Sequence, residues 1–424
     1  MNSYAGIDWA TRMHALWVVD RNGETLANEP FPHSESGLEE LISRMHDLGV
    51  CRVAIERPDG ILVDRLLEAG IVVLPIHART LKDTRPRFEA FARKSDPFDA
   101  FCLAELARTD SHRFRTLSPD SDQTRALRSM TRARGHMVKD RVLLASQLRA
   151  ELDGFWPGAS RIFHDVDSRL GLAFLRRYPC PEAAEELDVE RLAAFLKEHN
   201  YRNHHSAAKL LERLRSAPRG VSGCDESEAR AAVVLRWVAT LEQLVGGIHD
   251  ISQRIIRATH DHPDAKVFLP LFKYPKMAIT PAVLIAEIGD DRNRYPTAEV
   301  LASMAGMAPV AREGGKRRGI VFRHACNHRL RTAVSDLANS TRRHHPWAQG
   351  VYGAARERGL RHPHALRILG YAWVRVLWRC WQDEVAYDPS KHGNLRRLKA
   401  EEDLTQHSAS SPPESQVDQV QVAG

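Results

Sequence analysis

The sequence is poor in the features that mark secreted, membrane and metal-cluster proteins. Its 424 residues include only six cysteines, which are scattered without the paired spacing of a zinc site or a disulfide framework. No apolar run approaches the length of a membrane span. The chain enters a strand pattern at once, with no basic and then apolar signal peptide before it. We therefore expect reduced thiols, a cytoplasmic location and no membrane partner.

Positive charge is only slightly in excess, but its chemistry is informative. The 61 lysines and arginines outnumber the 54 acids, which gives a formal net charge of +7. Most of the basic residues are arginine, whose planar guanidinium suits bidentate phosphate contacts. The length and the 43% of hydrophobic residues predict a globular protein of roughly two to four domains. The charge favours a polyanionic partner without identifying it.

The most informative stretch is residues 93–100, RKSDPFDA, where two carboxylates lie three residues apart at the start of a predicted helix. Pro97 suits the first helical position, and Ser95 or Asp96 can cap the free amides of the first turn. Residues three apart share a helix face. Asp96 and Asp99 are therefore either the cap and the third-position acid of a capping box or two ligands of one metal ion.

Two earlier acids, Asp8 and Glu56, end apolar runs that are typical of strands. Residues 3–31 predict a hairpin and a third strand, and residues 35–74 predict helices alternating with strands. This order gives a mixed sheet with helices on both faces, in which functional residues gather at the ends of the central strands. Alone, each acid is an ordinary strand end. The four acids in this order indicate a site for a divalent metal ion.

Two long helices are predicted in the middle of the chain, over residues 119–152 and 229–259, with a helical insert over residues 155–220 between them. Their apolar residues keep close to heptad spacing, which an intramolecular antiparallel pair explains as well as a coiled-coil dimer does. Arginines fill much of the first helix outside its apolar positions. Three of them are predicted to contact phosphates: Arg125, Arg128 and Arg132.

Two basic segments are further candidates for contact with nucleic acid. Residues 79–94, just before the Asp96 helix, are either a solvated loop or a path for a strand entering the site. Residues 312–319, REGGKRRG, predict a glycine-rich loop in which backbone amides can approach phosphates. A plain flexible loop is the alternative there. Its three phosphate-binding candidates are Lys316, Arg317 and Arg318.

These patterns predict an α/β domain followed by helical regions. Residues 1–112 form the mixed-sheet domain, residues 113–263 the long helices with their insert, and residues 264–395 a mainly helical domain. Residues 396–424 are polar, with serine and proline, and are predicted to be a disordered tail.

The motifs together resemble the DEDD transposases of bacterial insertion sequences, over roughly residues 3–392. Five segments carry the resemblance: Gly6-Ile7-Asp8, Ala54-Ile55-Glu56, Lys94 to Ala100, Ala305 to Pro309, and the arginine-rich helix after Cys326-Asn327. The resemblance implies a RuvC-like domain of the ribonuclease H type, then a coiled coil, then a C-terminal transposase domain. It also implies an enzyme that cuts and exchanges DNA strands.

The mechanism is likewise implied by the resemblance. A structured guide RNA would bind the protein and pair with the element ends and the target DNA, so that base pairing selects the sequence. A homo-oligomer, either a dimer or a tetramer at the bacterial nucleoid, would join the acids of one subunit to a nucleophilic serine of another. The acids would bind Mg²⁺ or Mn²⁺ as hard oxygen ligands. They are Asp8, Glu56, Asp96 and Asp99.

The chain departs from the family pattern at the nucleophile. The family serine lies in the loop after the Ala-Gly-x-x-Pro segment, at the position of Gly314 or, one residue earlier, of Glu313. Neither residue carries a hydroxyl, and no serine occurs in this loop. Ser303 lies on the preceding predicted helix and is expected to pack. The glycine turn of the family's hairpin motif is also replaced, by Pro275-Lys276-Met277-Ala278.

Three functions follow from the intact acids and the missing serine. The first is an RNA-guided DNA recombinase that uses another nucleophile or retains only metal-dependent chemistry. The second is a transposase descendant that binds RNA and DNA without strand exchange. The third is a hydrolytic nuclease of DNA junctions that uses the acids alone.

Overall fold

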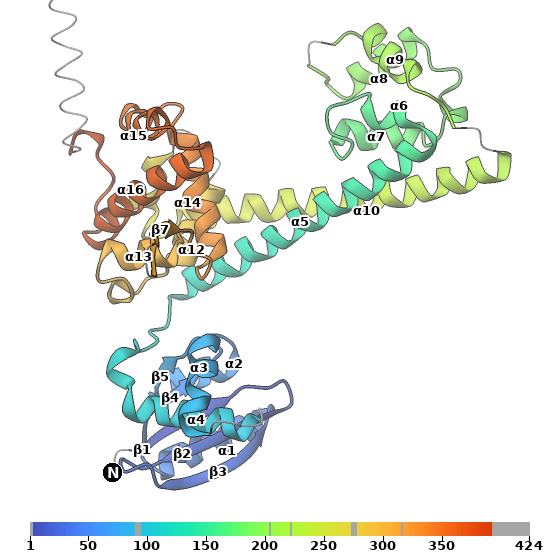
Figure 1. The fold of residues 1–424 in the computed structure, drawn as a ribbon. Helices are drawn as coiled ribbons and strands as arrows, with labels where there is room; N and C mark the ends of the chain where they lie inside the picture. Colours follow the sequence, from blue (N-terminus) through green and yellow to red (C-terminus); the bar gives the residue numbers. More distant parts are fainter. Residues whose placement is uncertain are drawn as a thin grey trace, which may run out of the picture. The chain divides into compact units, whose positions relative to one another are not determined.

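The computed structural model describes residues 3–89, 95–202, 205–220, 223–272, 278–314 and 317–391. The chain divides into two compact units. One consists of Met1–Ser121 with Asp291–Pro296, and the other of Asp122–Asp290 with Thr297–Gly424. Figure 1 shows the sheet of the first unit in blue and the helices of the second unit from teal to red.

The first unit is built on a five-stranded sheet. Its strands are β1 (Ser3–Asp8), β2 (Met13–Val19), β3 (Thr25–Pro32), β4 (Val50–Ile55) and β5 (Val72–Pro75). Their order is β3-β2-β1-β4-β5. The β1–β2 and β2–β3 pairs are antiparallel, and the β1–β4 and β4–β5 pairs are parallel. This is the strand order of the ribonuclease H fold, so the predicted mixed sheet is confirmed.

Helices cover both faces of the sheet, as the sequence predicted. They are α1 (Glu35–Asp47), α2 (Ile61–Glu68), α3 (Ala78–Phe88) and α4 (Asp96–Thr109). Apolar side chains of α1 and α2 share one core cluster with the sheet, and those of α3 and α4 share another. Helix α3 occupies most of the basic segment for which a loop or an open path was expected. Residues 90–94 of that segment lie outside the described residues.

Helix α4 packs directly on the backbone of β1. Gly6 lies within β1, and a Cβ atom at this position would collide with the backbone of Ala100 and of Ala104 in α4. Only a residue without a side chain permits this approach. The glycine therefore holds the helix that carries Asp99 against the strand that ends at Asp8.

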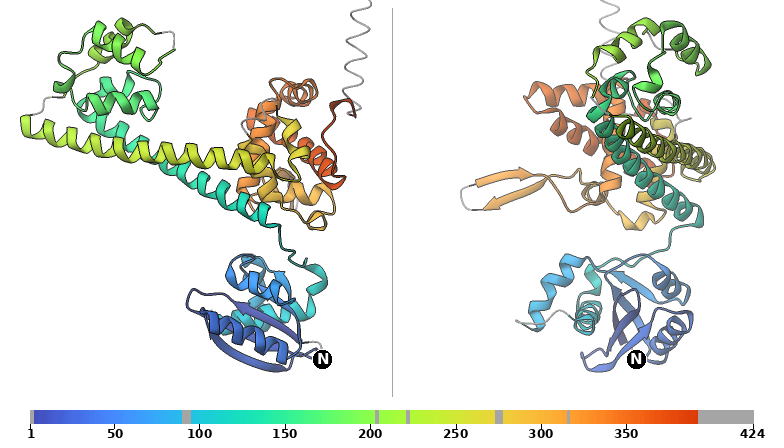
Figure 2. Two further views of the ribbon diagram at one scale, coloured as in Figure 1. Left: turned by 180° about the vertical axis from the view of Figure 1, so that it is seen from behind. Right: turned by 90° about the vertical axis from the view of Figure 1, so that its right-hand side faces the viewer.

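The second unit is mainly helical. Its long helices α5 (Asp122–Phe155) and α10 (Cys224–His260) lie side by side in both views of Figure 2. The insert between them contains α6 (Pro157–Arg161), α7 (Arg169–Arg177), α8 (Val189–Glu198) and α9 (Ala207–Ser216). The rest of the unit contains α11 (Ala265–Phe268), α12 (Ile279–Ile288), α13 (Ala298–Met304), α14 (His328–Thr341), α15 (Pro346–Glu357) and α16 (His362–Gln382). The long helices and the helical insert were both predicted.

The insert has an apolar core of its own. Trp156, Phe174 and Phe195 are each at most 2% exposed and belong to one cluster. Leu148 of α5 and Leu241 of α10 are fully buried in the same cluster. The insert is thus anchored to the two long helices by packing, which fixes the walls of a cavity that it contains.

The glycine-rich segment predicted as a loop is a β-hairpin. Strand β6 (Val310–Gly314) pairs with β7 (Arg317–Val321) in an antiparallel register that sets Glu313 opposite Arg318 and Gly314 opposite Arg317. Lys316 lies outside the described residues, as does the replaced hairpin motif at 275–277. The β-branched and apolar residues at the outer ends of both strands favour pairing over a free loop.

Among the described residues, α10 is the one helix long and apolar enough to cross a membrane, judged by length and composition alone. Only 22% of its most apolar window is buried within the chain. A core helix of a soluble protein meets the same criterion, so the finding is weak evidence for a membrane span.

Candidate active site

The central strands bring two of the predicted acids to one edge of the sheet. Strands β1 and β4 are parallel neighbours, and Ile7 pairs with Ile55 in their register. Both isoleucines are fully buried, which fixes the register at this end. Asp8, the last residue of β1, and Glu56, the first residue after β4, each follow one of these isoleucines, so their backbones leave the sheet side by side. Asp8 is half-buried and Glu56 is exposed.

Asp99 lies on the helix that packs on β1, and it is paired with an arginine. Its side chain is 3% exposed, and its two carboxylate oxygens accept hydrogen bonds from Nε and Nη2 of Arg85 at 2.5 and 2.7 Å. Ser95 precedes the first turn in an extended conformation and makes no side-chain cap. The carboxylate of Asp99 therefore serves this ion pair rather than the capping box that the spacing also allowed.

Arg85 also lies within electrostatic reach of Glu56. The hydrogen bonds with Asp99 raise the pKa of Arg85 against the opposing effect of burial, and the charges of Asp99 and Glu56 add to the increase. Glu56 is thus close enough to Arg85 to interact with it. The guanidinium supplies positive charge to the buried carboxylate of Asp99, and an opposite charge is what a buried carboxylate needs. Sequence reasoning missed Arg85 because its partner is on another helix.

The cysteine nearest this pair is excluded as a nucleophile. Burial, and then the negative charge of Asp99, raise the pKa of Cys102 to about 11. Since the thiolate is the reactive form of cysteine, Cys102 is an inert core residue at neutral pH.

The four acids match a divalent metal ion in chemistry, because carboxylate oxygens are the ligands that Mg²⁺ and Mn²⁺ prefer. Asp96 is exposed at the first residue of α4. Within the described part of the chain, no three His, Cys, Asp or Glu side chains lie close enough together to hold a metal ion. In this structure Arg85 supplies the positive charge beside Asp99. The residue types suit a divalent metal ion, and Asp99 is already paired with Arg85.

Aromatic and imidazole rings adjoin the two strand ends, and sequence reasoning missed them as well. The guanidinium of Arg57 stacks over the ring of Trp9 at 4.3 Å. Trp9 also lies near His14, whose Nε2 is 2.9 Å from Nδ1 of His33. Burial and then the neighbouring His33 lower the pKa of His14 to about 4, so this imidazole is neutral. Trp9 directly follows Asp8, and Arg57 directly follows Glu56. These positions in the sequence could have indicated that both residues lie beside the strand ends.

Of the three α5 arginines that were predicted to contact phosphates, two instead make hydrogen bonds within the protein. Arg132 donates to both carboxylate oxygens of Glu287 at 2.9 and 3.1 Å, and Arg128 donates to the carbonyl of Ala286 at 2.7 Å. They join α5 to α12. Arg125, by contrast, is half exposed and 3.9 Å from Asp122. It is therefore the most accessible of the three.

Glu287 is the centre of a closed network. It also accepts a hydrogen bond from the Asn327 amide at 2.7 Å. Burial by itself would raise its pKa, but the hydrogen bonds from Arg132 and Asn327 and the charges of Arg132 and Arg128 bring the pKa below the usual value. The carboxylate is thus ionised and satisfied, which is the state in which a buried acid stabilises a fold.

Two hydroxyls of the helical unit are candidates to replace the missing serine, those of Ser303 and Thr124. Ser303 is half-buried on α13. Thr124 is fully buried, with its Oγ1 2.8 Å from Nε2 of His262 and 2.6 Å from the Oδ1 of Asp290 to which it donates. Nδ1 of His262 accepts the N–H of Asp264, so its Nε2 carries the proton and cannot act as a base toward Thr124. This arrangement is structural.

Comparison with known proteins gives matches along the whole chain. A DEDD transposase model of the IS110 class matches residues 5–157, and a model for transposases of the IS116/IS110/IS902 family matches residues 277–353. Both models describe transposases, and together they match residues in both units.

Three similar relatives are insertion-element proteins. The mini-circle putative transposase for IS117 of Streptomyces coelicolor is 30% identical over 92% of this chain and 96% of its own length. The IS900 uncharacterized 42 kDa protein of Mycobacterium paratuberculosis is 27% identical over 91% of this chain and 97% of its own. The IS110 uncharacterized 43.6 kDa protein of S. coelicolor is 24% identical over 91% and 95%.

A solved structure, T. thermophilus RuvC in complex with a Holliday junction substrate, matches at 16% identity with a TM-score of 0.23. The match covers 28% of this chain and 100% of the RuvC chain.

Proposed function

This chain belongs to the IS116/IS110/IS902 family of transposases, and on that premise we propose that it cuts and rejoins DNA in a metal-dependent reaction directed by a structured RNA. The observation that supports the proposal is the end of the sheet where Asp8 and Glu56 lie on adjacent strands, together with the pair of Asp99 and Arg85. The charge of Glu56 also raises the pKa of Arg85. We place the reaction at the bacterial nucleoid, in the cytoplasm.

The proposed metal ligands are the four predicted acids. Bound Mg²⁺ or Mn²⁺ would polarise the phosphodiester and activate an oxygen nucleophile. The chain's own part is to hold these carboxylates in place. Asp8 and Glu56 are fixed by the buried register of β1 and β4, while Asp99 must first be released by Arg85. Asp96, exposed one helical turn before Asp99, completes the set. The ligands are Asp8, Glu56, Asp96 and Asp99.

An RNA partner would divide the work of recognition between base pairing and the protein. Base pairing would select the DNA sequence, and the protein would need only to hold backbones. Arg125, Arg317 and Arg318 are the proposed phosphate contacts, with Lys316 beside them in sequence. Binding to a structured RNA should then weaken steeply as salt rises, because neutralised phosphates release counterions. A flat salt dependence in an anisotropy titration would count against this part of the proposal.

A homo-oligomer is supported by apolar residues that the chain leaves uncovered on its long helices. Val142 and Leu143 of α5 are 61% and 58% exposed, and Val233 and Leu235 of α10 are 43% and 38% exposed. A second copy can cover such a surface, as in a coiled-coil dimer. The Val142→Glu, Leu143→Glu variant should lower the mass measured by light scattering. Unchanged mass would place the contact elsewhere.

Strand exchange is the direct test of the proposed activity. The purified protein, a candidate RNA from the element's non-coding end, and donor and target DNA are incubated with Mg²⁺. Joined products should form, and the Asp8→Asn variant should form none while still binding RNA. Equal product from Asp8→Asn would remove the acids from the reaction.

A second function, binding of RNA and DNA without strand exchange, is favoured by the lack of any hydroxyl between Val310 and Val321. If it holds, the wild-type chain forms no protein–DNA adduct on a denaturing gel. Gly314→Ser, or Glu313→Ser if the register is shifted by one, should then create one. Robust adducts from the wild-type chain would show that the nucleophile lies elsewhere, with Ser303 the next residue to test.

A further inference from the structure

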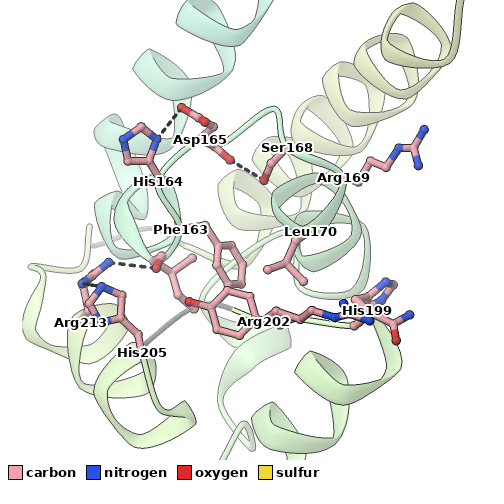
Figure 3. Close-up of a pocket in the computed structure, with 13 residues that line it drawn as sticks. Phe163, His164, Asp165, Ser168, Arg169, Leu170, His199, Arg202, His205 and Arg213 are labelled. Carbon is pink, nitrogen blue, oxygen red and sulfur yellow. Dashed lines mark hydrogen bonds and ion pairs between the residues drawn. The ribbon is translucent and has the colours of Figure 1, made fainter. Parts of the chain in front are cut away.

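The helical insert contains a cavity that neither the acids nor the predicted basic segments explain. Its volume is about 840 Å³, within the usual range for small-molecule sites. Figure 3 shows Phe163 and Leu170 at its centre, with Arg213 and His205 on one side and Arg202 and His199 on the other. Cations thus flank an apolar floor from two directions.

The floor is aromatic. The rings of Phe163 and Tyr201 both line the cavity, with their centroids 6.3 Å apart. Phe163 is buried in the core of the insert, which keeps the floor rigid, while Tyr201 is half-buried. A half-buried ring held against a buried one offers a flat apolar face on which a nucleobase can stack.

The sequence explains why Tyr201 and Arg202 reach the cavity. Helix α8 ends at Glu198 with His199 as its C-cap, and Asn200 follows in the left-handed region, at φ +53°. The N–H of Tyr201 donates to the carbonyl of Leu196, and that of Asn200 to the carbonyl of Lys197. This is a helix-ending turn that asparagine tolerates better than most residues. The turn directs the next two residues away from the helix axis and into the cavity wall.

The rim of the cavity is positively charged, and some of its charged side chains form no hydrogen bond or ion pair with the described residues. Three arginines and one aspartate line it, a difference of two positive charges when the histidines are neutral. Asp165 is 3.0 Å from His164, and Arg213 donates to the carbonyl of Ile162. Within the described part of the chain, Arg169 and Arg202 have no hydrogen-bond or ion-pair partner. Two exposed guanidinium groups are therefore free to bind an anion.

We propose that this cavity binds an unpaired nucleotide of a single-stranded segment, with the base on the aromatic floor and the flanking phosphates on the arginines. A polynucleotide places a phosphate on each side of every base, which matches cations on two sides of a stacking surface. The inference rests on the proposed function only in taking a polynucleotide as the partner. It does not depend on strand exchange.

The test maps photocrosslinks on the full-length protein. A short single-stranded RNA that contains 5-iodouridine, and a DNA of the same sequence that contains 5-iododeoxyuridine, are crosslinked and the modified peptides identified by mass spectrometry. We expect crosslinks at Phe163 or Tyr201. Crosslinking in either arm supports the site, and the stronger arm identifies the source of the nucleotide. Crosslinks confined to peptides outside residues 162–213 would overturn it.

Matched variants separate a specific site from general charge. Arg202→Gln removes a free cation from the rim, and Lys209→Gln removes an exposed cation of the same insert that does not line the cavity. Tyr201→Leu keeps an apolar side chain but removes the ring. Loss of a stacked base should weaken oligonucleotide binding about tenfold in Tyr201→Leu. Arg202→Gln should lose the crosslink, and Lys209→Gln should keep it.

Two outcomes of this comparison would contradict the inference. One is an equal loss of crosslinking in Arg202→Gln and Lys209→Gln, which would indicate only long-range electrostatics. The other is a Tyr201→Leu variant that binds as tightly as the wild type. A protein that fails to exchange strands and yet crosslinks here would leave this inference standing and remove only the proposed activity.

Discussion

Two buried carboxylates, one in each unit, accept the same bidentate hydrogen bonds from an arginine but have different surroundings. In the sheet unit, Asp99 accepts the hydrogen bonds of Arg85, and a further acid that acts on this arginine is Glu56. In the helical unit, Glu287 receives Arg132 next to further donors, Asn327 and Arg128. The first arginine neutralises a surplus of negative charge, whereas the second completes a network. The same contact thus belongs to a candidate site in the sheet unit. In the helical unit it belongs to a structural joint, by which we mean the Glu287 network that holds α5 against α12.

The largest effect should come from breaking the structural joint. Glu287→Gln removes the charge that balances Arg132 in a buried place, and breaking a buried ion pair costs about 3 kcal/mol of the free energy of unfolding. Chemical denaturation measures this. Glu242→Gln is the control, because its exposed pair with Arg176 should contribute less than about 1 kcal/mol. Equal costs for the two variants would show that Glu287 is not the centre of the joint.

The same joint predicts a dependence of stability on pH. The pKa of Glu287 in the folded state lies below its ordinary value of 4.5. Its contribution is therefore fully present above the ordinary pKa and is lost as the pH falls through the lowered folded value. The difference in stability between wild type and Glu287→Gln should shrink in that acidic window. A difference that stays constant to low pH would contradict the assignment.

A smaller effect is expected when the pair in the sheet unit is broken. Asp99→Asn keeps one acceptor for Arg85 and removes a negative charge from a crowded edge, so it should cost only about 1 kcal/mol without metal. Thermal unfolding of the metal-free protein measures this cost. A loss as large as that of Glu287→Gln would make Asp99 a structural residue as well, and the contrast between the two pairs would disappear.

The sequence predicted the elements better than the partners. Alternating apolar runs placed the five strands, and acids at their ends marked Asp8 and Glu56, because strand periodicity and strand ends are local properties. The partner of Asp99 was not predicted, since Arg85 reaches it only after α3 forms and packs. Likewise, Arg128 and Arg132 seemed free for phosphates until α12 brought Glu287 to them from far along the chain.

The basic glycine-rich segment shows the same limit. Its glycines and cations predicted a loop, whereas Val310 and Val321 pair at the open end of a hairpin. Pairing across a turn depends on both strands together, which a local reading of glycine content does not capture. The missing hydroxyl, in contrast, is a property of the sequence itself and needs no structure.

The central claim is that Arg85 and a divalent metal ion compete for Asp99 at the edge of the sheet. Thermal unfolding of the metal-free protein with increasing Mg²⁺ tests it, in the wild type, Arg85→Gln and Asp8→Asn. The account predicts that Mg²⁺ raises the unfolding temperature of the wild type, that Arg85→Gln reaches half of its increase at a lower Mg²⁺ concentration, and that Asp8→Asn responds least. The same Mg²⁺ midpoint in Arg85→Gln and wild type, or an undiminished response in Asp8→Asn, would contradict it.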